Sequence, residues 1–241
     1  MFVGEGPGRD EEKEGRPFVG ASGQFLRNTI DAVALKDYYI TNSVCCRSWT
    51  YEYDTEGNPK LDYKTHAPKR KDAPPNTVQV NACAQRLWEE IYLVDPVLIV
   101  ALGGSAAEAL LRQPVSMQKD SGVLKMMSVP GASFRPVLTD TGRKWARWTG
   151  AKGDRQMVWP YEQNAVYYPV LPLYHPAYVM AYEKDKRPGS PMHLFATGMK
   201  KASDIYTRYV QEVGGDTVIT ESTITEDDIY EAQYDAGTYH N

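Results

Sequence analysis

Residues 97–112 have the sequence VLIVALGGSAAEALLR, in which six apolar residues are followed by a glycine turn and a helical pattern. An entirely apolar run of this length is typical of a strand that is buried on both faces of a sheet. A strand, a tight turn and a helix in this order form one βα unit of a parallel sheet. We therefore predict a strand over 97–102 and a helix over 106–112.

Similar units surround this one along the chain. A short strand at 2–3 runs into the glycine-rich loop GEGPG, and apolar residues then recur at helical spacing over 22–35. The same patterns predict further elements at 37–44, 77–94, 167–173 and 191–210. Four strands separated by helices indicate an α/β fold, a three-layer α/β/α sandwich with a central, mostly parallel four-stranded sheet.

Two long stretches interrupt these units, and we interpret both as surface insertions. Residues 48–75 are polar, rich in Pro and Lys, and show no periodicity. Residues 113–166 are rich in Gly, and their Lys and Arg residues lie near tryptophans. Long loops often carry function. The composition of the second insertion favours contact with nucleic acid, although a surface for a partner protein would have a similar composition.

The charge is unevenly distributed. The chain has 241 residues, with 27 Lys and Arg against 31 Asp and Glu, for a net charge of −4. Residues 211–241 contain eight acidic residues and no Lys or Arg, so residues 1–210 carry +4. We interpret 1–210 as one domain, which is compatible with nucleic-acid binding, and 211–241 as an acidic tail that could bind a protein partner.

The remaining composition narrows the class of protein. A hydrophobic fraction of 42% and a charged fraction of 24% are ordinary for a globular domain. No apolar stretch reaches the roughly 18 residues of a membrane span, so we expect no membrane association. Three cysteines are too few for a disulfide scaffold and favour a reducing compartment. We expect a cytoplasmic location in a bacterium or a phage-infected host, and a monomer.

Three polar side chains follow strands of the predicted sheet. Glu5 follows the first strand, Asn42 ends the second and His175 follows the last. Ligands of parallel sheets bind outside the carboxyl ends of the strands, so an acid, an amide and an imidazole would meet there. Phe18 could add a stacking face for a polar heterocycle. Each residue alone has a structural explanation, such as a turn for Asn42, but their common edge favours a binding site.

Four segments together resemble one known family. They are GEGPGRDEEKEGRPFVGASGQFLRNTI from residue 4, YYITNSVCCRS from 38, DPVLIVALGGSAAEALL from 95 and PVLPLYHPAYVM from 169. In this order they are similar to the family 4 uracil-DNA glycosylases, over residues 2–209 apart from the insertions. The resemblance implies the uracil-DNA glycosylase α/β/α fold for residues 1–210.

The resemblance also implies roles in the pocket. Phe18 would stack on a flipped uracil, and Asn42 would pair with the base edge. His175 would hydrogen-bond the uracil oxygen O2 as the base leaves, and Glu5 would orient the attacking water. The loop residues implied to hold the base are Gly4, Gly6, Pro7 and Gly8.

Further residues are implied to contact DNA. They are Ser22, Ser105, Pro176, Tyr178, Val179, Met180 and Lys184. Val179 and Met180 stand where the family carries a wedge that enters the minor groove. Ala181 replaces a common arginine, whose phosphate contact Lys184, Lys186 or Arg187 could supply. Ser22 and Ser105 would bind phosphates at helix starts, although Ser105 could equally be a simple N-cap.

The cysteines depart from the family pattern. Family 4 members typically hold an iron–sulfur cluster with four cysteines, and Cys46 and Cys83 match two of these positions. A [4Fe-4S] cluster would require a cysteine pair upstream of the given sequence. We favour loss of the cluster and expect no cofactor, with Cys46 and Cys83 as small buried residues.

Our leading hypothesis is a monofunctional uracil-DNA glycosylase that acts on uracil-containing DNA and leaves an abasic site. Two alternatives remain open. In the first, a modified pyrimidine enters beside Gly8, where Glu11 is the nearest group that could block it. In the second, the chain is a catalytically weak homologue that binds DNA or a protein partner.

Overall fold

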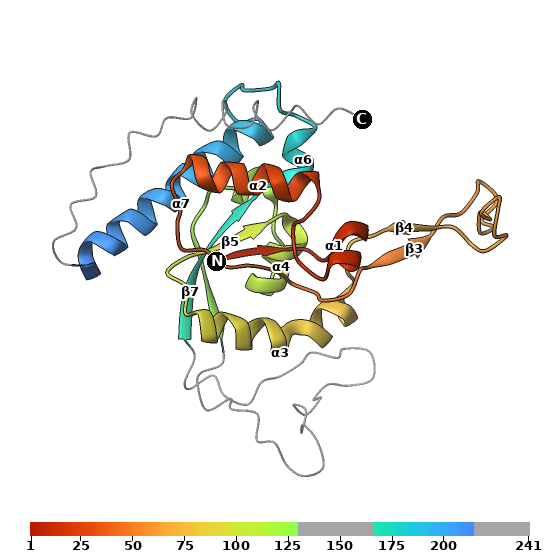
Figure 1. Ribbon diagram of the computed structural model, residues 1–241, viewed down its shortest axis with the longest axis horizontal. Coiled ribbons are helices and arrows are strands. Elements are labelled where there is room, and N and C mark those ends of the chain that lie inside the picture. The colour runs from red at the N-terminus through yellow and green to blue at the C-terminus, as the bar shows by residue number, and fades with distance from the viewer. Residues whose placement is uncertain (130–165, 215–241) are drawn as a thin grey trace, which may run out of the picture.

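The computed structural model describes residues 1–129 and 166–214 (Figure 1). The strands are β1 (Phe2–Gly4), β2 (Ile40–Asn42), β3 (Trp49–Tyr51), β4 (Arg70–Asp72), β5 (Ile99–Leu102), β6 (Lys125–Val129) and β7 (Val166–Leu173). The helices are α1 (Arg9–Glu14), α2 (Ala21–Ala32), α3 (Thr77–Val94), α4 (Gly104–Leu111), α5 (Met117–Asp120), α6 (Pro176–Met180) and α7 (Pro191–Gly214).

The central sheet has five strands in the order β2-β1-β5-β7-β6. The first four strands run parallel, with Gly4 paired to Asn42 and Leu102 paired to Leu173. β6 is antiparallel to β7 at the edge of the sheet. The carboxyl ends of β2, β1, β5 and β7 therefore lie side by side along one edge.

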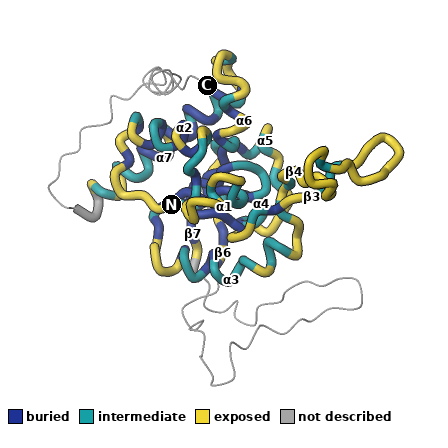
Figure 2. Tube along the Cα trace, turned by 45° about the vertical axis from the view of Figure 1, so that its right-hand side comes forward, coloured by how far each residue is buried: buried dark blue, intermediate teal, exposed yellow. Residues whose placement is uncertain are grey.

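Two hydrophobic cores cover the two faces of this sheet. Successive strand residues point to opposite faces, so Phe2 packs with α2, α6 and α7 whereas Val3 packs with α3 and α4. Figure 1 shows α2 and α7 on one side of the strands and α3 on the other. Burial of the strands between the helices is clear in Figure 2. The predicted three-layer α/β/α sandwich is confirmed.

The fifth strand, β6, lies inside the insertion expected at 113–166. Met127 and Val129 are buried there, whereas Met126 and Ser128 are exposed. This alternation is the two-residue period of a half-buried strand. It was present in the sequence but was hidden by the irregular residues around it. The four-stranded prediction was short by this strand, and α5 lies in the same stretch.

The insertion expected at 48–75 contains a β-hairpin rather than irregular chain. β3 and β4 pair antiparallel, with Trp49 opposite Asp72 and Tyr51 opposite Arg70. Figure 1 shows the hairpin projecting away from the sheet, beyond α1. Both strands have only three residues, so the pairing depends on cross-strand contacts that no local periodicity reveals.

The charged run after residue 8 forms helix α1, which we did not predict. Acidic residues occupy its first turn, and Gly15 ends it with a φ of 68°, a conformation that glycine adopts readily. At the other end of the chain, α7 extends to Gly214, so the segment assigned to the acidic tail begins in a helix.

The rest of the tail, 215–241, lies outside the described residues. So do most of the second insertion and its basic residues Lys144, Arg147, Lys152 and Arg155. Within the described ranges, none of the helices combines the length and apolar character that a membrane crossing requires.

Candidate active site

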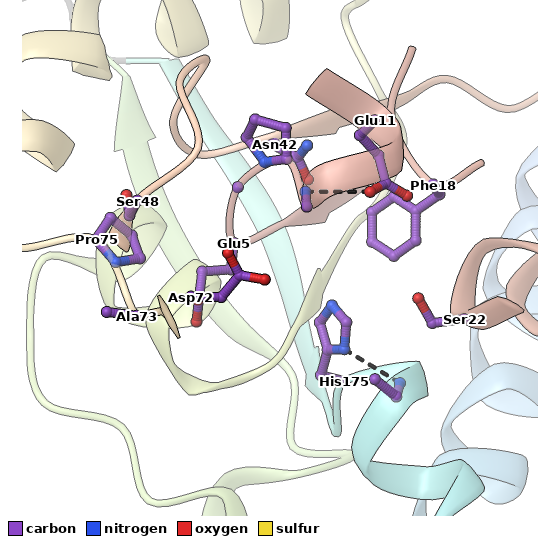
Figure 3. A pocket seen from close by; sticks show the side chains of 14 residues that line it. Glu5, Glu11, Phe18, Ser22, Asn42, Ser48, Asp72, Ala73, Pro75 and His175 are labelled. Atoms are coloured by element: carbon purple, nitrogen blue, oxygen red, sulfur yellow. Dashed lines mark hydrogen bonds between the residues drawn. The ribbon is translucent and has the colours of Figure 1, made fainter. Parts of the chain in front are cut away.

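A cavity of about 390 Å³ opens at the carboxyl edge of the parallel strands (Figure 3). Glu5 follows β1, Asn42 ends β2 and His175 lies two residues after β7. The structure thus brings together the three polar groups that the sequence placed at strand ends. The predicted site residues that line the cavity are Glu5, Gly6, Pro7, Gly8, Phe18, Ser22, Asn42 and His175.

Asn42 is held from behind by an arginine of α3. The Arg86 guanidinium donates to the backbone carbonyls of Asn42 at 2.5 Å and Ser43 at 3.1 Å. It also pairs with Glu90 at 2.7 Å. Asn42 is itself buried and lines the cavity, so the backbone that carries its amide is held in place. Sequence reasoning missed Arg86, because 44 residues separate it from Asn42 and no local pattern links them.

The glycine loop after β1 approaches Asn42 closely. A Cβ atom on Gly4 would lie 2.5 Å from Asn42 Oδ1 and 2.6 Å from Phe18 Cε2, so no side chain fits there. Ser43 holds the loop in place, because its amide donates to the Gly4 carbonyl at 2.8 Å and its hydroxyl donates to the Glu5 carbonyl. Gly4 therefore shapes the cavity without lining it, whereas Glu5 presents its side chain to it.

Phe18 adopts a left-handed backbone conformation, with φ of 54°. Glu11 of α1 stabilises this turn, because its carboxylate accepts hydrogen bonds from the amides of Val19 at 3.0 Å and Gly20 at 3.2 Å. The same carboxylate accepts from the Gly8 amide at 3.1 Å. Burial raises the pKa of Glu11, but the backbone hydrogen bonds outweigh it and the pKa lies below its usual value.

Glu11 thus ties the glycine loop to the turn that carries the aromatic ring. From the sequence, Glu11 was expected only to block the entry of a modified pyrimidine. A signal for its structural role was present, since Glu11 is the third residue of α1, and a glutamate there can bond back to the amide of the N-cap residue, Gly8.

His175 faces Phe18 across the cavity. The two rings stack with centroids 5.8 Å apart and an interplanar angle of 25°. The Ala177 amide donates to His175 Nδ1 at 3.2 Å, so Nδ1 is unprotonated and Nε2 carries the proton of the neutral ring. Burial lowers the pKa of His175, and the negative charge of Glu11 offsets this only in part. The cavity therefore contains a neutral imidazole with an N–H donor.

The predicted DNA contacts on α6 require correction. Val179 is 0% exposed and packs in the core with α2 and α7, so it does not form a wedge. Pro176 is also buried and serves as the first residue of α6. Met180 is half-buried against the same core. Tyr178 is 48% exposed and remains on the surface near the cavity.

The other predicted DNA contacts lie at two different places. Ser22 lines the cavity at the start of α2. Ser105 lies in the first turn of α4 and does not line it. Lys184 is exposed after α6, whereas Arg187 pairs with Asp185 at 2.8 Å.

The cysteines present do not fit a cluster held by four thiolates of this chain. Cys45 and Cys46 are exposed and Cys83 is half-buried, so the expectation that Cys46 is buried was wrong. Burial raises the pKa of Cys45, and its interaction with Cys83, which includes a hydrogen bond, raises it further. Cys83 therefore lies beside Cys45. Among the described residues, no group of three or more His, Cys, Asp or Glu side chains could hold a metal ion.

The chain is similar in sequence to known proteins. The chain is 28% identical over 180 residues to the type-4 uracil-DNA glycosylase of Sulfurisphaera tokodaii, covering 73% of this chain and 59% of that protein. Identity is 35% over 113 residues with the type-4 uracil-DNA glycosylase of Pyrobaculum aerophilum, covering 46% and 47% of the two chains. It is 34% over 110 residues with that of Archaeoglobus fulgidus, covering 45% of each.

These alignments span about half of the length of each relative. The model of a whole family, described as the uracil DNA glycosylase superfamily, matches residues 1–193. That range contains all the strands, the glycine loop, Phe18, Asn42 and His175. The chain therefore belongs to the uracil DNA glycosylase superfamily.

Proposed function

We propose that this protein removes uracil from DNA by flipping the nucleotide into the cavity and hydrolysing its N-glycosidic bond. One observation carries the proposal. A buried amide, a neutral imidazole, an aromatic ring and a carboxylate line a single cavity at the end of a parallel sheet. The relatives that align with the chain are named uracil-DNA glycosylases. Extrusion of the base costs a few kcal/mol, which contacts in the cavity would offset.

Asn42 would select uracil over cytosine. Its amide can donate to the uracil oxygen O4 and accept from N3–H, whereas cytosine reverses both polarities. Arg86 holds the backbone that carries this amide, and the absence of a side chain on Gly4 leaves room for Oδ1. A mismatched base would leave buried polar groups unpaired, which discriminates strongly. Phe18 would stack on the base and contribute about 1–3 kcal/mol.

His175 would stabilise the leaving base. When the N-glycosidic bond breaks, the bonding electrons go to uracil, and negative charge gathers on O2 and N1. The Nε2–H of the neutral imidazole would donate to O2. A neutral donor suits this role, because the lowered pKa of His175 keeps the ring uncharged at neutral pH.

Glu5 would orient the water that attacks the sugar carbon. Its carboxylate lines the cavity, and its negative charge would also stabilise the oxocarbenium-like sugar. The water oxygen forms the new bond to C1′, and its proton goes to the carboxylate or to solvent. In the described part of the chain, no lysine lines the cavity to form a covalent imine. We therefore expect an abasic product without strand cleavage.

Glu11 would restrict the size of the base. A Cβ atom on Gly8 would lie 2.7 Å from Glu11 Oε2, so the carboxylate fills the space beside this glycine. Its hydrogen bonds to three amides keep it there. This arrangement favours uracil over bases with a bulky substituent on C5.

The test is excision from labelled oligonucleotides that contain one uracil opposite G, opposite A, or unpaired. Hot alkali would convert abasic sites to strand breaks, and thymine and 5-hydroxymethyluracil would measure the restriction at C5. We expect breaks only after alkali. Asn42→Ala and His175→Ala should each lower the excision rate about 10²- to 10³-fold, as for loss of a donor that stabilises a transition state.

Asn28→Ala is the matched control, because the half-buried Asn28 of α2 does not line the cavity and its Oδ1 accepts from Gln24 of the same helix. It should leave the rate unchanged. Excision of a 5-substituted base in preference to uracil would reassign the substrate. DNA binding without excision of any base would show that the chain is a binding homologue and overturn the proposal.

A further inference from the structure

The β3–β4 hairpin begins and ends in the wall of the cavity. Ser48, directly before β3, lines the cavity together with Asp72 and Ala73 at the end of β4. The hairpin is fixed there, because Arg47 donates to Asp72 at 2.6 Å and lies 3.4 Å from Glu12 of α1. The Ala73 amide also donates to the Ser48 carbonyl at 3.1 Å. The hairpin is therefore a continuation of the active-site surface.

One face of the hairpin presents aromatic rings and a guanidinium together. Trp49 and Tyr51 alternate with Thr50, so they share a face with their cross-strand partners Asp72 and Arg70. The guanidinium carbon of Arg70 lies 4.0 Å from the centroid of the Trp49 ring. The Trp49 and Tyr51 rings lie 5.2 Å apart. Nucleobases stack on indole rings and on guanidinium planes.

The hairpin region carries no net charge, but three of its basic side chains are adjacent in sequence. Residues 48–75 contain five Lys and Arg and five Asp and Glu. Three of the acids are engaged: Asp72 with Arg47, and Asp54 and Asp62 with backbone amides of tight turns. In contrast, all three residues of the run 69–71, Lys-Arg-Lys, are exposed, and within the described chain none of them forms an ion pair within 4.0 Å.

We propose that the β3–β4 hairpin binds the DNA strand next to the flipped nucleotide, and that an unpaired base stacks on the Trp49–Arg70 pair. This rests on the uracil-excision function proposed above. The phosphates of that strand would lie along Lys69 and Lys71. The hairpin would thus favour uracil in single-stranded DNA or beside a strand end, where a flanking base is free to stack.

The experiment measures the dissociation constant (Kd) by fluorescence anisotropy, with DNA that contains a tetrahydrofuran abasic-site analogue. The analogue is placed in a single strand and in a duplex, at several salt concentrations. Trp49→Ala should raise Kd for the single strand about tenfold or more, as for loss of one stacked base. Arg70→Ala should do the same and reduce the salt slope by about one. kcat for uracil excision should stay within about twofold, so the effect falls on KM.

Two controls match these variants. Tyr92 at the far end of α3 is 46% exposed, close to the 41% of Trp49, and Tyr92→Ala should bind DNA like the wild type. The control for Arg70→Ala is Lys36→Ala, which also removes one positive charge. Lys36 is exposed and precedes β2, so it lies at the amino ends of the parallel strands, away from the cavity. Trp49→Phe keeps an aromatic ring and should restore most of the binding, which separates stacking from hairpin folding.

The outcomes distinguish this inference from the proposed function. If the wild type excises uracil but both hairpin variants bind within twofold of it, the hairpin inference is overturned and the function stands. If the wild type excises nothing but Trp49→Ala and Arg70→Ala still weaken binding, the function fails and the hairpin surface stands. If the wild type does not bind DNA, both proposals are overturned.

Discussion

The cavity and the β3–β4 hairpin achieve their arrangement in different ways. Around the cavity, each functional side chain is backed by main-chain contacts, as Asn42 is by Arg86 and Phe18 by Glu11. In the hairpin, Trp49 and the basic residues 69–71 are exposed and Tyr51 is half-buried, and the ion pair of Arg47 with Asp72 holds the hairpin where it joins the cavity. Chemistry needs groups held within fractions of an ångström, whereas strand binding tolerates side chains that adapt. Substitutions should therefore have large effects in the first region and small effects on the fold in the second.

The most damaging single change to the cavity should be Gly4→Ala. The added methyl would overlap Asn42 Oδ1 and the Phe18 ring and displace both. A displacement of about 1 Å costs about 10²-fold in rate, so kcat should fall by at least that factor. The measurement is single-turnover excision. Gly20→Ala is the control, because its Cβ would make only ordinary contacts, with Glu11 Oε1 at 3.7 Å and Asp10 Oδ2 at 4.0 Å. Equal effects at the two sites would contradict the tight packing described here.

Loss of the support behind Asn42 should affect stability as well as rate. Arg86→Met removes hydrogen bonds to two carbonyls and leaves Glu90 unpaired. The free energy of unfolding should fall by about 2 kcal/mol, as for hydrogen bonds that involve a charged group. Denaturant unfolding checks this value, with Arg208→Met on the exposed side of α7 as control. Adding Glu90→Gln should recover part of the loss; no recovery would show that the ion pair is unimportant.

A subtler change at the cavity concerns the pH dependence. Glu11 raises the pKa of His175 by its charge, against the larger effect of burial. Glu11→Gln removes that charge, so the pKa of His175 should fall further. Activity needs the neutral ring, since a proton on Nδ1 would oppose the Ala177 amide. Activity is therefore lost as pH falls through this pKa, and the acidic limb of kcat should move to lower pH.

Glu12→Gln is the control for that shift. Glu12 is the next residue in α1, but its carboxylate faces Arg47. Its substitution should leave the limb in place. An unchanged profile in Glu11→Gln, or a shift to higher pH, would show that the Glu11 charge does not act on His175.

The smallest effect is expected at the hairpin tip. Tyr63 is 92% exposed, the highest exposure among the large hydrophobic residues of the described chain. Tyr63→Ala should change the free energy of unfolding by less than about 0.5 kcal/mol. Thermal unfolding measures this directly. A larger loss would mean that the tip packs against another part of the protein, and the contrast between the two regions would fail.

Helices and strands were predicted correctly from the sequence where the apolar residues follow one clear pattern. The helix over 77–94 and the buried strand in 97–102 coincide with α3 and β5 because their apolar residues face a core directly. β6 and the hairpin were not predicted. β6 lies among irregular residues, and the hairpin is defined by pairing between its two strands. Helix α1 carried recognisable signals, namely acidic residues in the first turn and a terminal glycine.

The site shows the same division. Glu5, Asn42 and His175 could be found because strand ends share an edge in a parallel sheet. Arg86 could not, because its contact with Asn42 spans 44 residues and arises only from packing of α3 on β2. Val179 was assigned to a wedge by its position after the histidine, but an apolar side chain on a short helix can equally face the core. Position in a motif does not decide which way a side chain points.

The left-handed turn at Phe18 also limits how this sequence can change through evolution. A Cβ atom on Gly23 would overlap the backbone of Phe18, so a first mutation at this glycine disrupts the ring before any second mutation can compensate. Replacement of Phe18 by glycine would relieve the backbone but remove the ring. At position 18, glycine would therefore favour stability, whereas phenylalanine favours activity. We therefore expect evolution to retain three residues together: Phe18, Gly23 and Glu11. A substitution at one of them is not tolerated while the other two are unchanged.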